Sequence, residues 1–71
     1  MAGLKKQFGQ NVTRQRRALG MTHEELAEAV GKTIDTISNI ERGIQGPRFD
    51  LLEDLAIVLE CEVYELFLFD D

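Results

Sequence analysis

The chain has 71 residues, one histidine, one cysteine (Cys61) and a formal net charge of −5. A chain this short buries a modest core and a lone cysteine excludes an internal disulfide, so we expect apolar helix packing to stabilise a single domain spanning residues 1–71. The lone histidine and the lack of paired Cys/His spacings or a glycine-rich phosphate loop leave nothing to assemble a zinc or catalytic site, so we expect no metal, no cofactor and no enzymatic activity.

The first predicted helix is amphipathic. Apolar residues recur with helical spacing along nearly the whole chain, and no segment alternates apolar and polar residues long enough to form a strand. Leu4, Phe8, Val12 and Leu19 share one face of this first helix, and basic residues lie between them. Gly20 is expected just past its end, where glycine commonly terminates a helix.

The second helix has a clear start signal. Residues 22–25 have the form Thr-x-x-Glu, a capping box whose two side chains satisfy free N–H groups at a helix start. Leu26, Ala27 and Val30 give this helix its buried face. Gly31 is expected to end it after about three turns.

A third helix is predicted over residues 33–42, with Thr33 as its cap and Gly43 at its end. Ile37 and Ile40 are its inward positions. A fourth helix is predicted over residues 50–59, where apolar residues follow the i, i+3, i+4, i+7 pattern.

The last apolar residues before the C-terminus, Val63, Leu66 and Phe67, indicate a short fifth helix. The sequence therefore predicts an all-α fold, a compact five-helix bundle.

The most informative feature is the spacing of Ala27, Gly31 and Ile37, with three and then five residues between them. Two helices that meet steeply need a small residue where their backbones approach and a glycine where the turn passes through positive φ. They also need a bulky branched residue in the angle between them. Leu26 and Ile40 fill out the same core, and the whole arrangement is typical of a helix-turn-helix.

The stretch from Phe8 to Phe67 resembles the Cro/C1-type helix-turn-helix domains of the XRE family, which includes phage repressors and bacterial regulators. The resemblance implies a lambda-repressor-like bundle of five helices, with the second and third helices as the DNA-reading pair. It implies a sequence-specific transcriptional regulator that binds double-stranded DNA, and we expect a repressor of bacterial or phage type. The shared signatures are FG at 8–9, Arg16, GMT at 20–22, EELA at 24–27, Gly31, TIS at 36–38, IERG at 40–43, Pro47, LA at 55–56 and ELF at 65–67.

The resemblance implies base contacts from Ile34, Asp35 and Asn39 on the third helix. Ile34 can contact thymine methyl groups or be a scattered surface apolar residue. Asp35 can accept from the cytosine amine, or can simply complement the dipole at a helix N-terminus. Asn39 can pair with adenine or face solvent.

Contacts with the DNA backbone are expected from residues around the two reading helices. His23 stands where the family usually has glutamine, so its phosphate contact is open, and a lone histidine is often only a surface residue. Arg48 matches an arginine that approaches the minor groove in related repressors. The full expected set is Thr22, His23, Thr33, Thr36, Ser38, Arg42 and Arg48.

The resemblance also implies an ion pair between Arg16 and Glu41 that ties the first helix to the third. The alternative for Arg16 is a phosphate contact. We favour the structural role, because a buried pair broken on one side loses about 3–5 kcal/mol.

Charge is divided unevenly along the chain. Residues 1–49 hold eight Lys/Arg and five acidic residues, a net +3, whereas residues 50–71 hold eight acidic and no basic residues, a net −8. Salt screens charges beyond about 10 Å at 0.1 M, so the front can face nucleic acid while the back stays away from it.

The C-terminal half offers a candidate dimer surface of five apolar residues. We expect a homodimer, at least on DNA, because one small module binds weakly alone. The operator would then be palindromic. The alternative is that Leu68 and Phe69 fold over their own core. The candidate residues are Leu51, Ile57, Val58, Leu68 and Phe69.

No apolar run marks a signal peptide or approaches membrane-spanning length, so we expect a cytoplasmic protein with no membrane association. The alternative to a DNA-binding regulator is a protein-interaction module. An antitoxin, or a regulator whose partner carries the activity, could bind that protein partner through the acidic, apolar C-terminal half.

Overall fold

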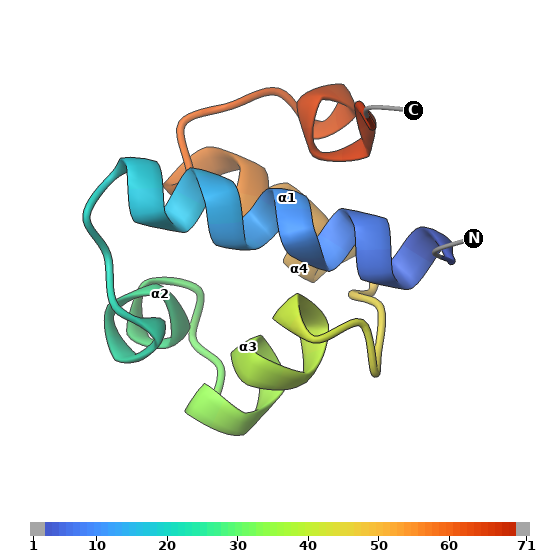
Figure 1. Cartoon of the computed structure of the whole chain (residues 1–71). Coiled ribbons are helices and arrows are strands. Elements are labelled where there is room, and N and C mark those ends of the chain that lie inside the picture. Colours follow the sequence, from blue (N-terminus) through green and yellow to red (C-terminus); the bar gives the residue numbers. More distant parts are fainter. Residues whose placement is uncertain (1–2, 70–71) are drawn as a thin grey trace.

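The computed structural model describes residues 3–69, which form four α-helices and one 3-10 helix. The elements are α1 (Leu4–Ala18), α2 (His23–Ala29), α3 (Ile34–Glu41), α4 (Phe49–Val58) and the 3-10 helix η1 (Val63–Phe67). In Figure 1, α1 crosses the middle of the molecule, with α2 and α3 on one side of it and η1 on the other. No strand occurs among the described residues, and the all-helical architecture is as predicted.

The prediction of a fifth α-helix is wrong. η1 has five residues, and the N–H of Glu65 donates to the carbonyl of Glu62 three residues earlier, at 3.0 Å. A segment this short leaves almost no room for the i to i−4 bonds of an α-helix, so the tighter 3-10 turn forms instead. The side chains of Glu62 and Glu65 form a capping box that fixes the start of this turn.

Two caps and one glycine fix the connection between α2 and α3. The hydroxyl of Thr22 accepts from the Glu25 N–H at 3.1 Å, and the Glu25 carboxylate accepts from the Thr22 N–H at 2.8 Å. The hydroxyl of Thr33 accepts from the Thr36 N–H at 3.2 Å. Gly31 lies between them with φ +70°, a left-handed conformation that only glycine adopts readily. The angle between the two helices is therefore set locally.

The core draws on all five elements and contains the predicted helix-turn-helix residues. Leu26, Ala27, Ile37 and Ile40 are each at most 2% exposed. Gly31, which we grouped with that core, is exposed at the surface and serves the turn rather than the packing.

Three leucines lie differently from expectation. Leu4 and Leu19 are exposed, because they lie at the two ends of α1, where the predicted apolar face has no neighbour. Leu51 was expected on the dimer surface, but it is 5% exposed and belongs to the core. Leu51 and the core residue Leu52 are adjacent in the first turn of α4, and both side chains are buried although they point in different directions from the helix. Leu51 therefore cannot contribute to a dimer surface.

A close approach of α1 and α3 depends on Gly9. A Cβ at this position would lie 2.7 Å from the carbonyl oxygen of Glu41 and closer still to that of Ile40. The backbones of the two helices therefore touch, and only glycine leaves room for this contact. This crossing holds the C-terminal end of α3 against α1.

The C-terminal segment is fastened to α1 by a buried amide. Asn11 is 6% exposed, and its Nδ2 donates to the carbonyls of Leu66 and Leu68 at 3.0 and 2.9 Å. The rings of Phe8 and Phe67 also pack together, with their centroids 5.0 Å apart. Within residues 3–69, none of the helices combines the length and the apolar character that a membrane crossing needs.

Candidate nucleic-acid interface

The outward face of α3 carries the residues predicted to read bases. Ile34 is 45% exposed, Asp35 is exposed and Asn39 is half-buried, whereas Ile37 and Ile40 on the opposite face are fully buried. Because Ile34 is not needed by the core, its exposure leaves an apolar contact surface at the start of the helix. The structure thus brings these three predicted residues together on one exposed face.

Gln45 is a neighbour of this face that the sequence reasoning missed. The Nδ2 of Asn39 donates to the Oε1 of Gln45 at 3.4 Å. The loop after α3 folds back on the helix, since the N–H groups of Ile44 and Gln45 donate to the Asn39 carbonyl at 2.9 and 3.3 Å. The signal in the sequence was Gly43, which ends the helix with φ +78° and turns the chain back.

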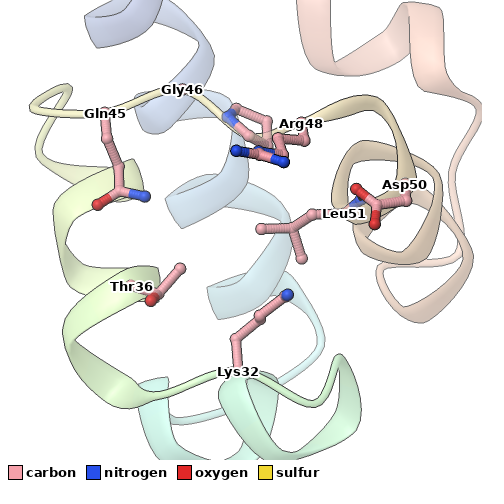
Figure 2. A pocket seen from close by; sticks show the side chains of 8 residues that line it. Lys32, Thr36, Gln45, Gly46, Arg48, Asp50 and Leu51 are labelled. Atoms are coloured by element: carbon pink, nitrogen blue, oxygen red, sulfur yellow. The ribbon is translucent and has the colours of Figure 1, made fainter.

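One side of α3 borders a groove of about 370 Å³ between the α2–α3 turn and the start of α4. In Figure 2, Lys32 enters this groove from one end and Arg48 from the other, with Leu51 between them. Thr36 lines it from α3. Arg48 was predicted to contact the DNA backbone, but Lys32 was not. The position of Lys32, a basic residue directly before the Thr33 cap of the reading helix, could have indicated a phosphate contact.

A second groove, of about 260 Å³, borders the other side of α3. Thr36 and Ser38 are two residues apart, about 200° around a helix, which is why they line different grooves. Arg17, missed as a contact, lines this groove together with three predicted backbone-contact residues. Those three are His23, Ser38 and Arg42. Thr22 and Thr33 line neither groove, and their hydroxyls accept the capping bonds described above.

The floor of the second groove is a buried ion pair. Arg16 donates to Glu41 through Nε at 2.8 Å and Nη2 at 3.1 Å, and their side chains are 8% and 5% exposed. The third guanidinium nitrogen, Nη1, donates to the Met21 carbonyl at 2.7 Å. The geometry is that of the expected structural pair, and all three guanidinium nitrogens of Arg16 donate within the protein.

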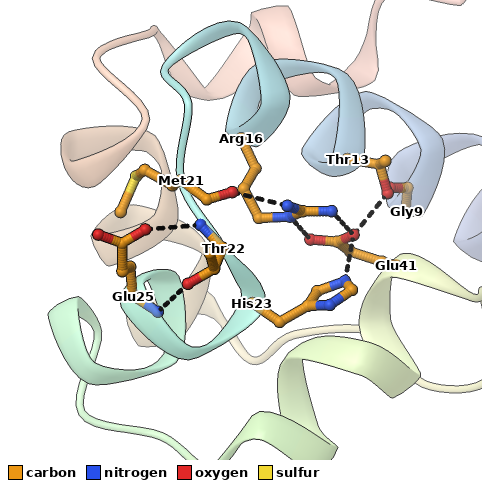
Figure 3. A network of polar contacts seen from close by, with 8 residues as sticks. All are labelled: Gly9, Thr13, Arg16, Met21, Thr22, His23, Glu25 and Glu41. Carbon is orange, nitrogen blue, oxygen red and sulfur yellow. Dashed lines mark hydrogen bonds and ion pairs between the residues drawn. The ribbon is translucent and has the colours of Figure 1, made fainter.

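Glu41 receives two further partners. The hydroxyl of Thr13 donates to its Oε1 at 2.8 Å, and the Nε2 of His23 lies 3.0 Å from the same oxygen. Figure 3 shows side chains from α1 and α2 converging on this carboxylate of α3. Burial would raise the pKa of Glu41, but hydrogen bonds from Arg16, Thr13 and His23 and the charge of Arg16 outweigh it, so the pKa lies below its usual 4.5. The carboxylate is therefore charged at neutral pH and fixes the N-terminal end of α2 against α3.

The candidate dimer surface is only partly as expected. Ile57 and Leu68 are 73% and 60% exposed, whereas Val58 packs partly against the core and Phe69 is half-buried, with its ring against that of Phe67. Tyr64, which we did not predict for this surface, is 64% exposed. Residues 50–69 contain six acidic residues and no Lys, Arg or His.

Within residues 3–69, no group of three His, Cys, Asp or Glu side chains is placed to hold a metal ion. Cys61 is a free thiol, and burial first, then the charges of Glu65 and Glu62, raise its pKa.

Known proteins with similar sequences are regulators. An uncharacterised HTH-type transcriptional regulator of Archaeoglobus fulgidus is 41% identical over 56 residues, which cover 79% of this chain and 80% of that protein. Another from Methanothermobacter thermautotrophicus is 38% identical over 61 residues, covering 84% of this chain and 88% of the relative.

Solved structures with similar folds are regulators too. The restriction-modification controller protein C.AhdI of Aeromonas hydrophila has a TM-score of 0.83 and 32% identity, covering 87% of this chain and 94% of its own. The biofilm master regulator SinR, crystallised in complex with DNA, has a TM-score of 0.78 and 35% identity, covering 83% of this chain and 95% of its own. The sequence model of the family described as Helix-turn-helix matches residues 12–66. With that match across most of its length, the chain belongs to the helix-turn-helix family of transcriptional regulators.

Proposed function

We propose that this chain is a sequence-specific regulator that binds double-stranded DNA and reads the major groove with α3. The observation that carries the proposal is the uncovered face of α3, where Ile34, Asp35 and Asn39 project outward from a helix whose other face is fully buried. A major groove about 12 Å wide admits one such helix. The regulator SinR, with a similar fold, was crystallised with DNA, which supports the same use of this fold here.

Each residue on that face has a chemically distinct target. The Ile34 side chain suits the methyl group of thymine, and the Asp35 carboxylate can accept from the N4 amine of cytosine. Asn39 can pair with adenine through both of its polar atoms. Gln45 already accepts a hydrogen bond from Asn39, so it orients that amide and can reach the neighbouring base pair.

Affinity comes from the basic residues that flank α3 on both sides. Lys32 and Arg48 line one groove, and Arg17 and Arg42 line the other. This places positive charge beside the helix on each side, where the two phosphate strands bordering a major groove would run. Eight of the thirteen acidic residues lie in residues 50–71 and all eight Lys/Arg lie in residues 1–49, so the overall charge of −5 does not prevent this interaction.

We propose that two copies bind together on a palindromic operator, with α3 of each copy in successive major grooves about 34 Å apart. Ile57, Tyr64 and Leu68 are the exposed apolar residues that would meet across a twofold axis. We propose that the bound dimer represses transcription by blocking access to the same DNA. We propose that it acts on this DNA in the cytoplasm.

A fluorescence anisotropy titration against a set of labelled genomic duplexes tests the proposal. We expect a preference among duplexes and a steep loss of affinity between about 0.05 and 0.2 M salt. Arg48→Ala should weaken all duplexes alike and reduce the salt slope by about 1, because a phosphate contact carries no sequence information. Glu28→Ala, a change at an exposed α2 residue that lines neither groove, is the matched control.

A second candidate function is binding of a protein partner through the acidic C-terminal surface. The exposed Ile57, Tyr64 and Leu68 in a region without basic residues favour this reading. Absence of salt-sensitive binding to every duplex in the same titration would support it and would remove the DNA-binding proposal.

A further inference from the structure

His23 occupies an unusual position between a buried carboxylate and an open groove. Its Nε2 lies 3.0 Å from Oε1 of Glu41, while 43% of its side chain remains exposed. In Figure 3 the other ring nitrogen, Nδ1, faces away from Glu41. It is the only histidine in the chain, so any histidine-dependent behaviour of this protein arises here.

The carboxylate decides which ring nitrogen carries the proton. An ionised carboxylate can only accept hydrogen bonds, so the 3.0 Å contact with Glu41 requires a proton on Nε2. In a neutral imidazole the other nitrogen, Nδ1, is then an acceptor and repels a phosphate oxygen. In the imidazolium both nitrogens carry protons, and Nδ1 becomes a charged donor.

The groove that His23 lines has the composition of an anion site. Arg17 from α1 and Arg42 from the C-cap of α3 line it, and Ser38 adds a hydroxyl. Its floor is the ion pair of Arg16 and Glu41, whose own charges are mutually satisfied.

We propose that this groove is a proton-linked phosphate site, in which a DNA phosphate binds together with one proton taken up by His23. The inference rests on the proposed DNA-binding function and adds a dependence on pH that a glutamine at this position could not supply. Protonation then gives Nδ1 a phosphate oxygen as acceptor, while Nε2 keeps Glu41.

The surrounding charges act on this proton in both directions. The carboxylate of Glu41 on α3 favours the imidazolium, and Glu24 and Glu25 on α2 add negative charge nearby. The guanidinium groups of Arg17 and Arg42, and that of Arg16, which shares Glu41 with His23, oppose it in the free protein. A bound phosphate offsets positive charge in the groove and adds an anion near the ring, so binding DNA favours the proton.

The first test measures affinity for a short fluorescein-labelled duplex by anisotropy, at constant ionic strength, from about pH 5 to pH 8, the range in which histidine ordinarily changes charge. The protein must carry no histidine tag. We expect affinity to rise as pH falls, with a slope approaching tenfold per pH unit, which is the limit of about one proton. His23→Gln is the control, because its amide can still donate to Glu41 but cannot titrate.

The two proposals fail in different ways. A slope that is the same in the wild type and in His23→Gln would overturn the proton linkage while leaving DNA binding intact. Absence of binding at every pH would overturn the proposed function and this inference with it.

A second readout does not depend on the variant. Proton NMR follows the Cε1–H resonance of the single histidine through the same pH range, without and with the duplex. We expect the titration midpoint to move to higher pH when DNA is bound, and an unchanged midpoint would contradict the inference.

Discussion

Replacing Glu41 by alanine leaves the Arg16 guanidinium buried without its carboxylate. Glu41 accepts four hydrogen bonds, two from Arg16 and one each from Thr13 and His23, and after the change Arg16 retains only the carbonyl of Met21. Breaking a buried pair on one side costs about 3–5 kcal/mol. A chain of 71 residues has a total stability of about 4–11 kcal/mol. We therefore expect Glu41→Ala to lose at least about a quarter of its free energy of unfolding.

Urea unfolding followed by circular dichroism at the helix band measures this loss. The double variant Arg16→Met/Glu41→Leu is the control, because removing both charges leaves no buried ion and should restore most of the stability. A loss below about 1 kcal/mol in Glu41→Ala, which is the range of surface ion pairs, would refute the reasoning. So would a double variant that is as unstable as the single one.

Two further predictions concern the backbone, one concerns acid stability and one concerns association. Glu60 has φ +58° just past α4, a left-handed conformation that is strained for every residue but glycine. Glu60→Gly should therefore raise the free energy of unfolding by about 0.5–1 kcal/mol, seen as a higher melting temperature. Glu60→Gln, which removes only the charge, should not raise it. Gly9→Ala should cost about 1–3 kcal/mol in urea unfolding because its methyl group would strike two carbonyls of α3, whereas Gly46→Ala, with only an ordinary contact, should cost little. The pKa of Glu41 is lower in the folded protein than its unfolded value of 4.5, so its pairing contributes stability above that value, which is lost as pH falls through the folded pKa. Glu41→Gln should therefore reduce the difference in unfolding free energy between neutral and acid pH. An unchanged difference would count against the pairing. Salt screens the repulsion between two acidic surfaces, so it should strengthen dimerisation, measured by sedimentation, while it weakens DNA binding. Ile57→Asp should reduce dimerisation without unfolding the chain, because Ile57 is 73% exposed.

Local patterns predicted the part of the fold that positions α3. The spacing of Ala27, Gly31 and Ile37 lies within a single turn and its flanking helices, so the sequence alone indicates their packing. The caps at Thr22 and Thr33 were equally predictable, because each bond spans three residues.

Contacts between distant segments were harder to predict. The pairing of Arg16 with Glu41 came only from the family resemblance, since 25 residues separate them. The contact of His23 with Glu41 depends on how α2 and α3 sit on α1, and no periodicity reports this. Burial of Leu51 was missed for the same reason, because a helical wheel cannot show which neighbour covers the edge of a stripe.

Sequence-specific binding depends most on α3 reading base edges through its uncovered face. Selection of bound sites from a random duplex pool, done in parallel with the wild type, Asp35→Ala and Asn39→Ala, tests this directly. We predict a two-half-site motif for the wild type and, for each variant, loss of preference at one base pair of each half-site, worth about 1–3 kcal/mol per contact. No enriched motif, or the same motif from all three proteins, would contradict the account.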